Sequence, residues 1–113
     1  MKAYVESLSR SCLLTLHTNE SGCHSLAGAL RWAQRSHQPS VWVDCRHIQD
    51  LPAEALLLLR QCASRLWERG GHLIVCHLPE AARTELAADA SQPLAASLLD
   101  AARYGLHLPG STR

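Results

Sequence analysis

Short apolar runs alternate with polar turns along the first half of the chain and predict two strands, a helix and a third strand. Residues 2–7 alternate in polarity and residues 13–17 are largely apolar, so the segment 8–11 between them is expected to close a hairpin. Four apolar residues then follow helical spacing and predict a helix: Leu26, Ala29, Leu30 and Ala33. Pro39 ends this helix, and residues 40–45 (SVWVDC) predict a buried strand.

The second half opens with the pattern of a long helix from Pro52 to Arg69. Proline suits a first helical turn, and the pair Gly70-Gly71 supplies the stop. Residues 72–78 (HLIVCHL) predict a further strand, and another helix is expected from Pro79 to about Ala88.

The tail pattern is weaker than the rest. Residues 92–97 have room for a very short strand near Leu94, and Ser97 would cap a helix from Leu98 to Tyr104. Strands separated by helices predict parallel pairing with right-handed crossovers. We therefore expect a single α/β domain over residues 1–113. Its sheet is mixed and mostly parallel, with four to five strands, an antiparallel N-terminal hairpin and helices packed on it.

Charge and hydropathy exclude several classes of protein. The net charge is +1 and the arginines are scattered, so the chain lacks the basic patch that nucleic-acid binding needs. No run approaches the roughly 18 apolar residues that cross a bilayer. The opening residues MKAYVESLSR contain no apolar signal core. We expect a cytoplasmic protein that neither binds nucleic acid nor inserts directly into a membrane.

Candidate chemistry is sparse. The five cysteines show no CxxC motif and no zinc-finger spacing, so we expect reduced and mostly buried thiols, with no metal. Asp44, Cys45 and His47 end a predicted parallel strand, where open α/β sheets bind ligands. Asp44 and Cys45 should point to opposite faces, however, and no nucleophile elbow or nucleotide fingerprint accompanies them. We expect no enzyme activity, no catalytic residue and no cofactor.

Residues 41–86 resemble the core of a STAS domain, the module of anti-sigma factor antagonists and sulfate-transporter tails. That family has a strand ending in Asp or Asn, a loop, an Asp-Ser-Ser-Gly turn, a leucine-rich helix, a Gly-Gly pair and a strand resembling LIVC. The present chain follows this layout without a gap, and LLTLHTNESGCHSLAGAL upstream fits the second strand and first helix more loosely. The resemblance implies a single STAS-like domain and a regulatory protein that binds other proteins.

The turn at residues 52–55 departs from the family pattern, because it reads Pro-Ala-Glu-Ala. Ala53 stands where a partner kinase phosphorylates a serine in the family, and residues 41–63 contain no hydroxyl side chain. A phosphate would add about −1.5 to −2 charge at this helix N-terminus. Glu54 either imitates that charge permanently or only stabilises the helix start, by roughly 0.3–1 kcal/mol.

One side of the long helix should face away from the sheet. At about 100° per residue, the inner face holds a set of mostly apolar residues: Ala55, Leu56, Leu59, Cys62, Ala63, Leu66 and Trp67. Leu58 lies at its margin. In the family the outer side meets partners, which implies a contact surface of six residues here: Ala53, Glu54, Leu57, Arg60, Gln61 and Ser64. His47 and Asp50 in the preceding loop are expected at its rim.

These observations favour a non-enzymatic interaction module of the anti-sigma factor antagonist type that works without the serine phospho-switch. Its expected partner is an anti-sigma factor or a kinase-like regulator. One alternative is the STAS subunit of an ABC-type membrane transport complex. Another is a small-molecule binder or enzyme at Asp44 and His47. Self-association as a homodimer, through the helix face or the first hairpin, stays open.

Overall fold

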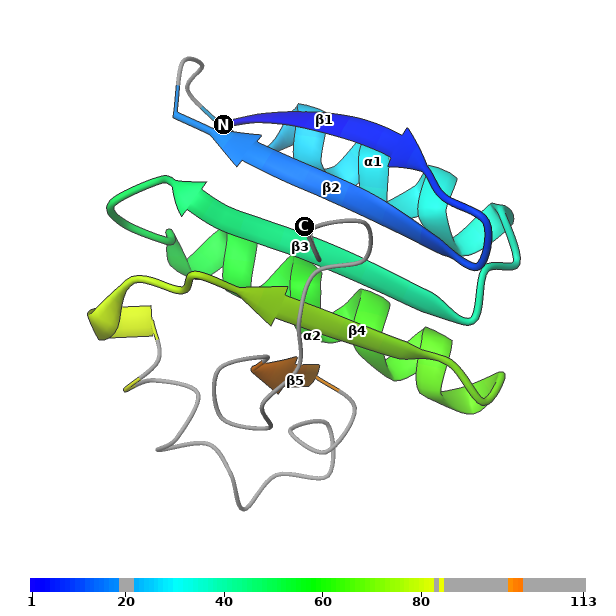
Figure 1. Ribbon diagram of the computed structural model, residues 1–113. Coiled ribbons are helices and arrows are strands. Elements are labelled where there is room, and N and C mark those ends of the chain that lie inside the picture. The colour runs from blue at the N-terminus through cyan, green and yellow to red at the C-terminus, as the bar shows by residue number, and fades with distance from the viewer. Residues whose placement is uncertain (19–21, 83, 85–97, 101–113) are drawn as a thin grey trace, which may run out of the picture.

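Within the part of the chain that the structure describes, five strands form one mixed sheet in the order β1-β2-β3-β4-β5 (Figure 1). The strands are β1 Lys2–Ser7, β2 Ser11–His17, β3 Ser40–His47, β4 His72–Cys76 and β5 Leu98–Asp100. The first pair is antiparallel and the following pairs are parallel. This computed structural model describes residues 1–18, 22–82, 84 and 98–100. The predicted α/β domain with an antiparallel N-terminal hairpin is confirmed.

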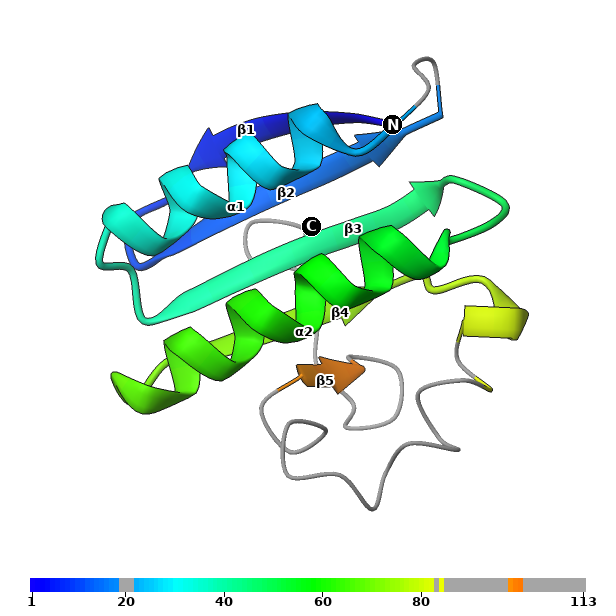
Figure 2. The same ribbon diagram turned by 180° about the vertical axis from the view of Figure 1, so that it is seen from behind.

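Two helices, α1 His24–Arg35 and α2 Ala53–Glu68, cover the same face of the sheet (Figures 1 and 2). α1 buries the four residues whose spacing predicts it: Leu26, Ala29, Leu30 and Ala33. α2 buries six of the seven residues expected on its inner face: Ala55, Leu56, Leu59, Cys62, Ala63 and Leu66. Residues 80–82 and 84 are helical, as expected of the helix after Pro79, and the remainder of that prediction lies outside the described residues.

The larger hydrophobic core lies between the sheet and the two helices. Its fully buried side chains come from three strands and both helices, and they include Leu14, Leu16, Val43, Val75, Leu26 and Leu59. A smaller cluster contains Trp42, Ile74 and Cys76, with Leu13 packed beside it. Since neighbouring strand residues point to opposite faces, β3 and β4 bury both faces of the sheet. The nearly continuous apolar runs of these strands are typical of such positions.

Trp67 is the one residue of the predicted inner face that the structure places elsewhere. Its side chain is 52% exposed, and its ring meets His72 edge-on at 5.4 Å between centroids. Trp67 lies in the last turn of α2 and at the edge of the arc formed by the buried residues. The expectation that it packs on the sheet is therefore wrong.

The chain at residues 98–100 is also different from the prediction. A helix beginning at Leu98 is wrong, because residues 98–100 form β5 and pair parallel with Leu73–Val75 of β4. A pairing partner gives the backbone groups of β4 hydrogen bonds that an isolated short helix would not supply. The segments 92–97 and 101–104, which belong to the same prediction, lie outside the described residues.

All five cysteines are buried. The thiol of Cys62 on α2 makes the free energy of unfolding depend on pH in the alkaline range. Burial raises the pKa of the Cys62 thiol from 9.0 to about 11. Below pH 9 the thiol keeps its proton in both the folded and the unfolded protein, and its contribution to the free energy of unfolding is fully present. This contribution is lost as the pH rises toward 11, because the unfolded protein releases the proton first. At about 1.36 kcal/mol per pKa unit, the loss is about 2–3 kcal/mol.

The measurement is urea unfolding at a series of pH values across this window. The free energy of unfolding should fall less steeply for Cys62→Ala than for the wild type. Taking the difference between the two proteins removes the contribution of every other ionisable group. Two parallel curves would contradict a buried, proton-retaining Cys62.

Candidate protein-binding surface

The outer side of α2 faces away from the sheet and carries the six residues expected to meet a partner. Leu57 is 55% exposed, whereas Leu56 and Leu59 are buried. Ala53, Glu54 and Gln61 are also exposed, and Arg60 and Ser64 are half-buried: all six share one side of the helix at about 100° per residue. In Figure 2 this helix lies in front of the sheet. The structure thus brings the six residues together on one accessible side.

Trp67 enlarges this surface, and helical spacing alone assigned it to the wrong face. Trp67 and Leu57 are two of the five large hydrophobic side chains that are exposed in the described part of the chain. They are ten residues apart, which is about 15 Å along a helix. Half-buried Arg60 lies between them in the sequence. We call these seven residues the α2 surface: Ala53, Glu54, Leu57, Arg60, Gln61, Ser64 and Trp67.

The start of α2 lacks the side-chain cap that a serine or aspartate would supply. Pro52 is the N-cap residue, and no side chain caps the helix by a hydrogen bond. Burial raises the pKa of the Cys23 thiol, and the nearby Glu54 carboxylate raises it further. Glu54 therefore lies beside the start of α1 as well as in the first turn of α2.

The two predicted rim residues do not share one location. The ring of His47 stacks on the ring of His17, with 4.5 Å between centroids and 10° between planes. His17 also meets Tyr4 edge-on at 5.2 Å. Leu16 packs in the core under the helices, so the neighbouring His17 points to the opposite face of the sheet. His47 lies with it, away from the α2 surface, while Asp50 is exposed in the loop before α2.

A polar cluster lies at the carboxyl ends of β3 and β4, the edge at which open α/β sheets bind ligands. Asp44 is 5% exposed and accepts two contacts from Arg46: the backbone N–H at 3.0 Å and the side-chain Nε at 2.9 Å. Arg46 Nη2 donates to His77 Nε2 at 3.2 Å. Cys45 belongs to the core under the helices, so it points away from Asp44 as expected.

The same cluster contains donors that bind metals. Among the residues that the structure describes, only Asp44, Cys76 and His77 bring three such donor atoms together, all within 4.8 Å of one another. The Arg46 guanidinium already occupies the Asp44 carboxylate and the His77 ring nitrogen. The guanidinium is always protonated and only donates hydrogen bonds. It therefore places at these two groups the positive charge that a metal ion would otherwise bring. The cluster therefore joins the ends of two strands.

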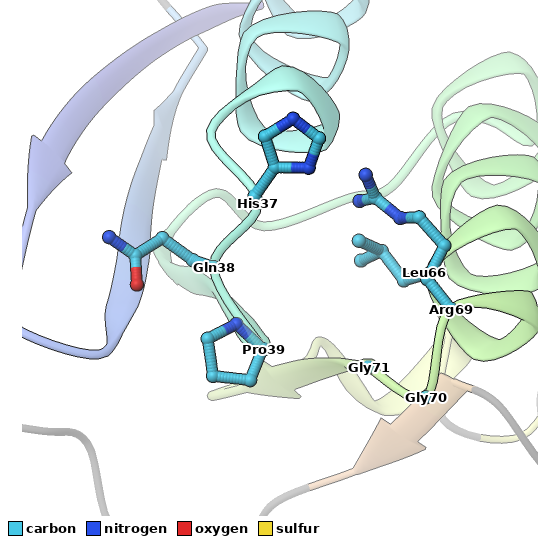
Figure 3. Close-up of a pocket in the computed structure, with 7 residues that line it drawn as sticks. All are labelled: His37, Gln38, Pro39, Leu66, Arg69, Gly70 and Gly71. Carbon is cyan, nitrogen blue, oxygen red and sulfur yellow. The ribbon is translucent and has the colours of Figure 1, made fainter.

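A small hollow lies near the amino ends of β3 and β4, between the α1–β3 connection and the end of α2 (Figure 3). It has a volume of about 200 Å³, and its lining includes His37, Leu66 and Arg69. Arg69 Nη1 donates to the carbonyl oxygen of Gln34 at 2.7 Å. Ligand sites have volumes of about 300–1,000 Å³. This hollow is smaller than that and does not indicate a small-molecule site.

Comparison with known proteins supports the fold. No model of a protein family matches the sequence, and no curated protein matches it. The chain is similar in structure to the protein TM1081, solved by NMR, with a TM-score of 0.67 over 85% of this chain and 77% of that one. The two sequences are 9% identical, so the likeness extends to the arrangement of strands and helices only.

Among the described residues, no helix is both long and apolar enough to cross a membrane.

Proposed function

We propose that this chain is a STAS-type regulatory module that binds another protein through the α2 surface. The observation that carries the proposal is the outer side of α2, where Leu57 is 55% exposed and Trp67 is 52% exposed. Tryptophan and arginine are enriched among the residues that dominate protein–protein binding energy. An exposed leucine and tryptophan on either side of Arg60 therefore favour a protein partner.

The mode of regulation proposed here does not use serine phosphorylation. Residues 41–63 contain no serine, threonine or tyrosine, and Ala53 begins α2. The nearest hydroxyl on α2 is that of half-buried Ser64, about three turns beyond the helix start. A kinase-like partner would thus bind this helix without transferring a phosphate to its first turn. Binding would be controlled by the amount or state of the partner.

Leu57→Glu is expected to abolish partner capture and leave the fold intact. The change places a charge in the centre of an apolar contact, while an exposed side chain contributes little to stability. The measurement is co-purification with a C-terminally tagged chain from the source cells, followed by identification of the bound protein. Arg10→Glu is a matched control, because it also adds negative charge at an exposed position, in the hairpin turn away from α2.

The result that supports the proposal is an anti-sigma factor or a kinase-like protein, captured by the wild type and by Arg10→Glu and lost with Leu57→Glu. The melting temperature of Leu57→Glu should stay close to that of the wild type. An ATPase or permease subunit in place of such a regulator would move the chain to the transport alternative. A partner retained by Leu57→Glu would show that the α2 surface is not the contact.

A further inference from the structure

β1 forms an edge of the sheet, and among the residues that the structure describes no strand lies beside its outer side. The strand is six residues long, and all six pair with β2 in an antiparallel register. Figure 1 shows β1 along the upper border of the sheet, on the opposite side from β5. An edge strand of this length presents backbone groups that can pair with another chain.

Most of the large apolar side chains that are exposed in the described part of the chain lie at this edge. Three of the five large ones are Tyr4 at 50%, Val5 at 41% and Trp32 at 43% exposure. A groove of about 550 Å³ runs between β1 and α1, and its lining includes Ala3, Val5, Gly28 and Trp32. A strand added beside β1 would lay alternate side chains over this groove, because side chains point alternately to the two faces.

The direction of the backbone groups limits how such a strand can pair. The Ala3 N–H donates to Ser25 Oγ at 3.0 Å, so it points away from β2. In an antiparallel ladder the outward groups recur at every second residue, which here means Ala3, Val5 and Ser7. If the added strand is β1 of a second copy, each hydrogen-bonded pair must join one of these three residues in the first copy to one of the same three in the second.

Charge then selects one register for two copies of β1. With Tyr4 opposite Tyr4 of the second copy, Ala3 lies opposite Val5, which satisfies the backbone rule. The same register places Lys2 of each copy opposite Glu6 of the other, so two pairs of opposite charge form across the two-fold axis. Opposite charges that face each other across strands stabilise a sheet, and like charges destabilise it.

We propose that the chain forms a two-fold symmetric homodimer through antiparallel pairing of β1 with β1, in the register that pairs Lys2 with Glu6. The interface joins the two sheets into one continuous sheet and brings Val5 of one copy over the groove beside Trp32 of the other. Ser25 controls the affinity, because its hydroxyl must release the Ala3 N–H before Ala3 can join the ladder. The α2 surface lies at a distance from β1 and stays uncovered in both copies.

The test exchanges the charges and measures mass by sedimentation velocity, with the N-terminus free of any tag. We expect a wild-type dimer and a dissociation constant at least about tenfold higher for Lys2→Glu alone or Glu6→Lys alone, since each creates two like-charge pairs. The two single variants mixed in equal amounts should associate with each other, because the mixture restores two opposite-charge pairs. The double variant K2E/E6K should also dimerise.

Two further variants distinguish pairing through β1 from a dimer through another face of the domain. Ser25→Ala should tighten the dimer by freeing the Ala3 N–H, and Leu57→Glu should leave it unchanged because Leu57 lies on α2. Circular dichroism of each variant checks that the fold is retained. A monomeric wild type and a monomeric Ser25→Ala at millimolar concentration would overturn the proposal. The proposal would also be overturned if neither Lys2→Glu nor Glu6→Lys changed the dissociation constant of the dimer, or if Leu57→Glu dissociated it. Either result would place the interface elsewhere.

Discussion

Leu59→Ala is expected to lower the free energy of unfolding by about 2–5 kcal/mol. The Leu59 side chain is 0% exposed and lies on the inner face of α2, in the core between the helices and the sheet. Shortening it removes buried methyl groups and leaves a cavity that the packed neighbours fill only in part. Guanidinium unfolding followed by tryptophan fluorescence measures the change, at an unaltered m-value.

Leu57→Ala is the matched control, because it makes the same chemical change two residues earlier on the same helix. Helix propensity therefore changes equally in both variants. Leu57 is 55% exposed, and its replacement should alter the free energy of unfolding by no more than about 0.5 kcal/mol. Equal losses in the two variants would mean that Leu57 belongs to the core, and the proposed function would lose its main support.

Local patterns predict most of the fold, because the four strands β1 to β4 and the helices α1 and α2 are each reflected in the pattern of neighbouring residues. The period of α2 separates Leu59 from Leu57, and the apolar run of β3 indicates a strand buried on both faces. Gly70 also ends α2 as predicted, with a positive φ of 79° that glycine adopts at little cost. These features depend on the residues of one element and need no knowledge of distant contacts.

The features that the sequence does not predict depend on residues far apart in the chain. Residues 98–100 form β5 because they pair with the edge of β4, and no pattern among the neighbouring residues indicates that this edge is there. Arg46 contacts both Asp44 and His77, and His77 is 31 residues away from Arg46 in the sequence. The backbone of His77 has a φ of 56°. Trp67 is exposed because it lies in the last turn of α2, at the margin of the buried arc. In each case the partner is set by the fold.

The two proposed interfaces lie on separate parts of the domain. The α2 surface belongs to the helix that packs against β4, whereas the dimer edge belongs to β1 and α1. A dimer through β1 would therefore present two copies of the α2 surface to partners. Two linked copies raise the apparent affinity for a partner that is itself dimeric, provided that the geometry lets both engage. Disrupting β1 should then weaken partner capture without abolishing it.

Gly71→Ala is expected to destabilise the fold by about 1–3 kcal/mol through a clash with backbone. A Cβ on Gly71 would lie 2.8 Å from the carbonyl oxygen of Pro39 and 3.3 Å from that of Leu66. The Pro39 oxygen cannot simply move away, because it accepts a hydrogen bond from the His72 N–H at 3.0 Å. The substitution thus separates the end of α2 from the beginning of β3. Thermal and denaturant unfolding both measure the loss.

Two other glycines show whether crowding is the cause. Gly28 lies within α1 and has ordinary room for a Cβ, with the nearest atom at 3.9 Å. Gly28→Ala should stabilise the protein by roughly 0.5–1 kcal/mol, because alanine favours a helix. Gly70 has a positive φ and open space around it, so Gly70→Ala should cost about 1 kcal/mol from backbone strain alone. If Gly71→Ala cost no more than Gly70→Ala, the close approach of Gly71 to Pro39 would not be a constraint on this fold.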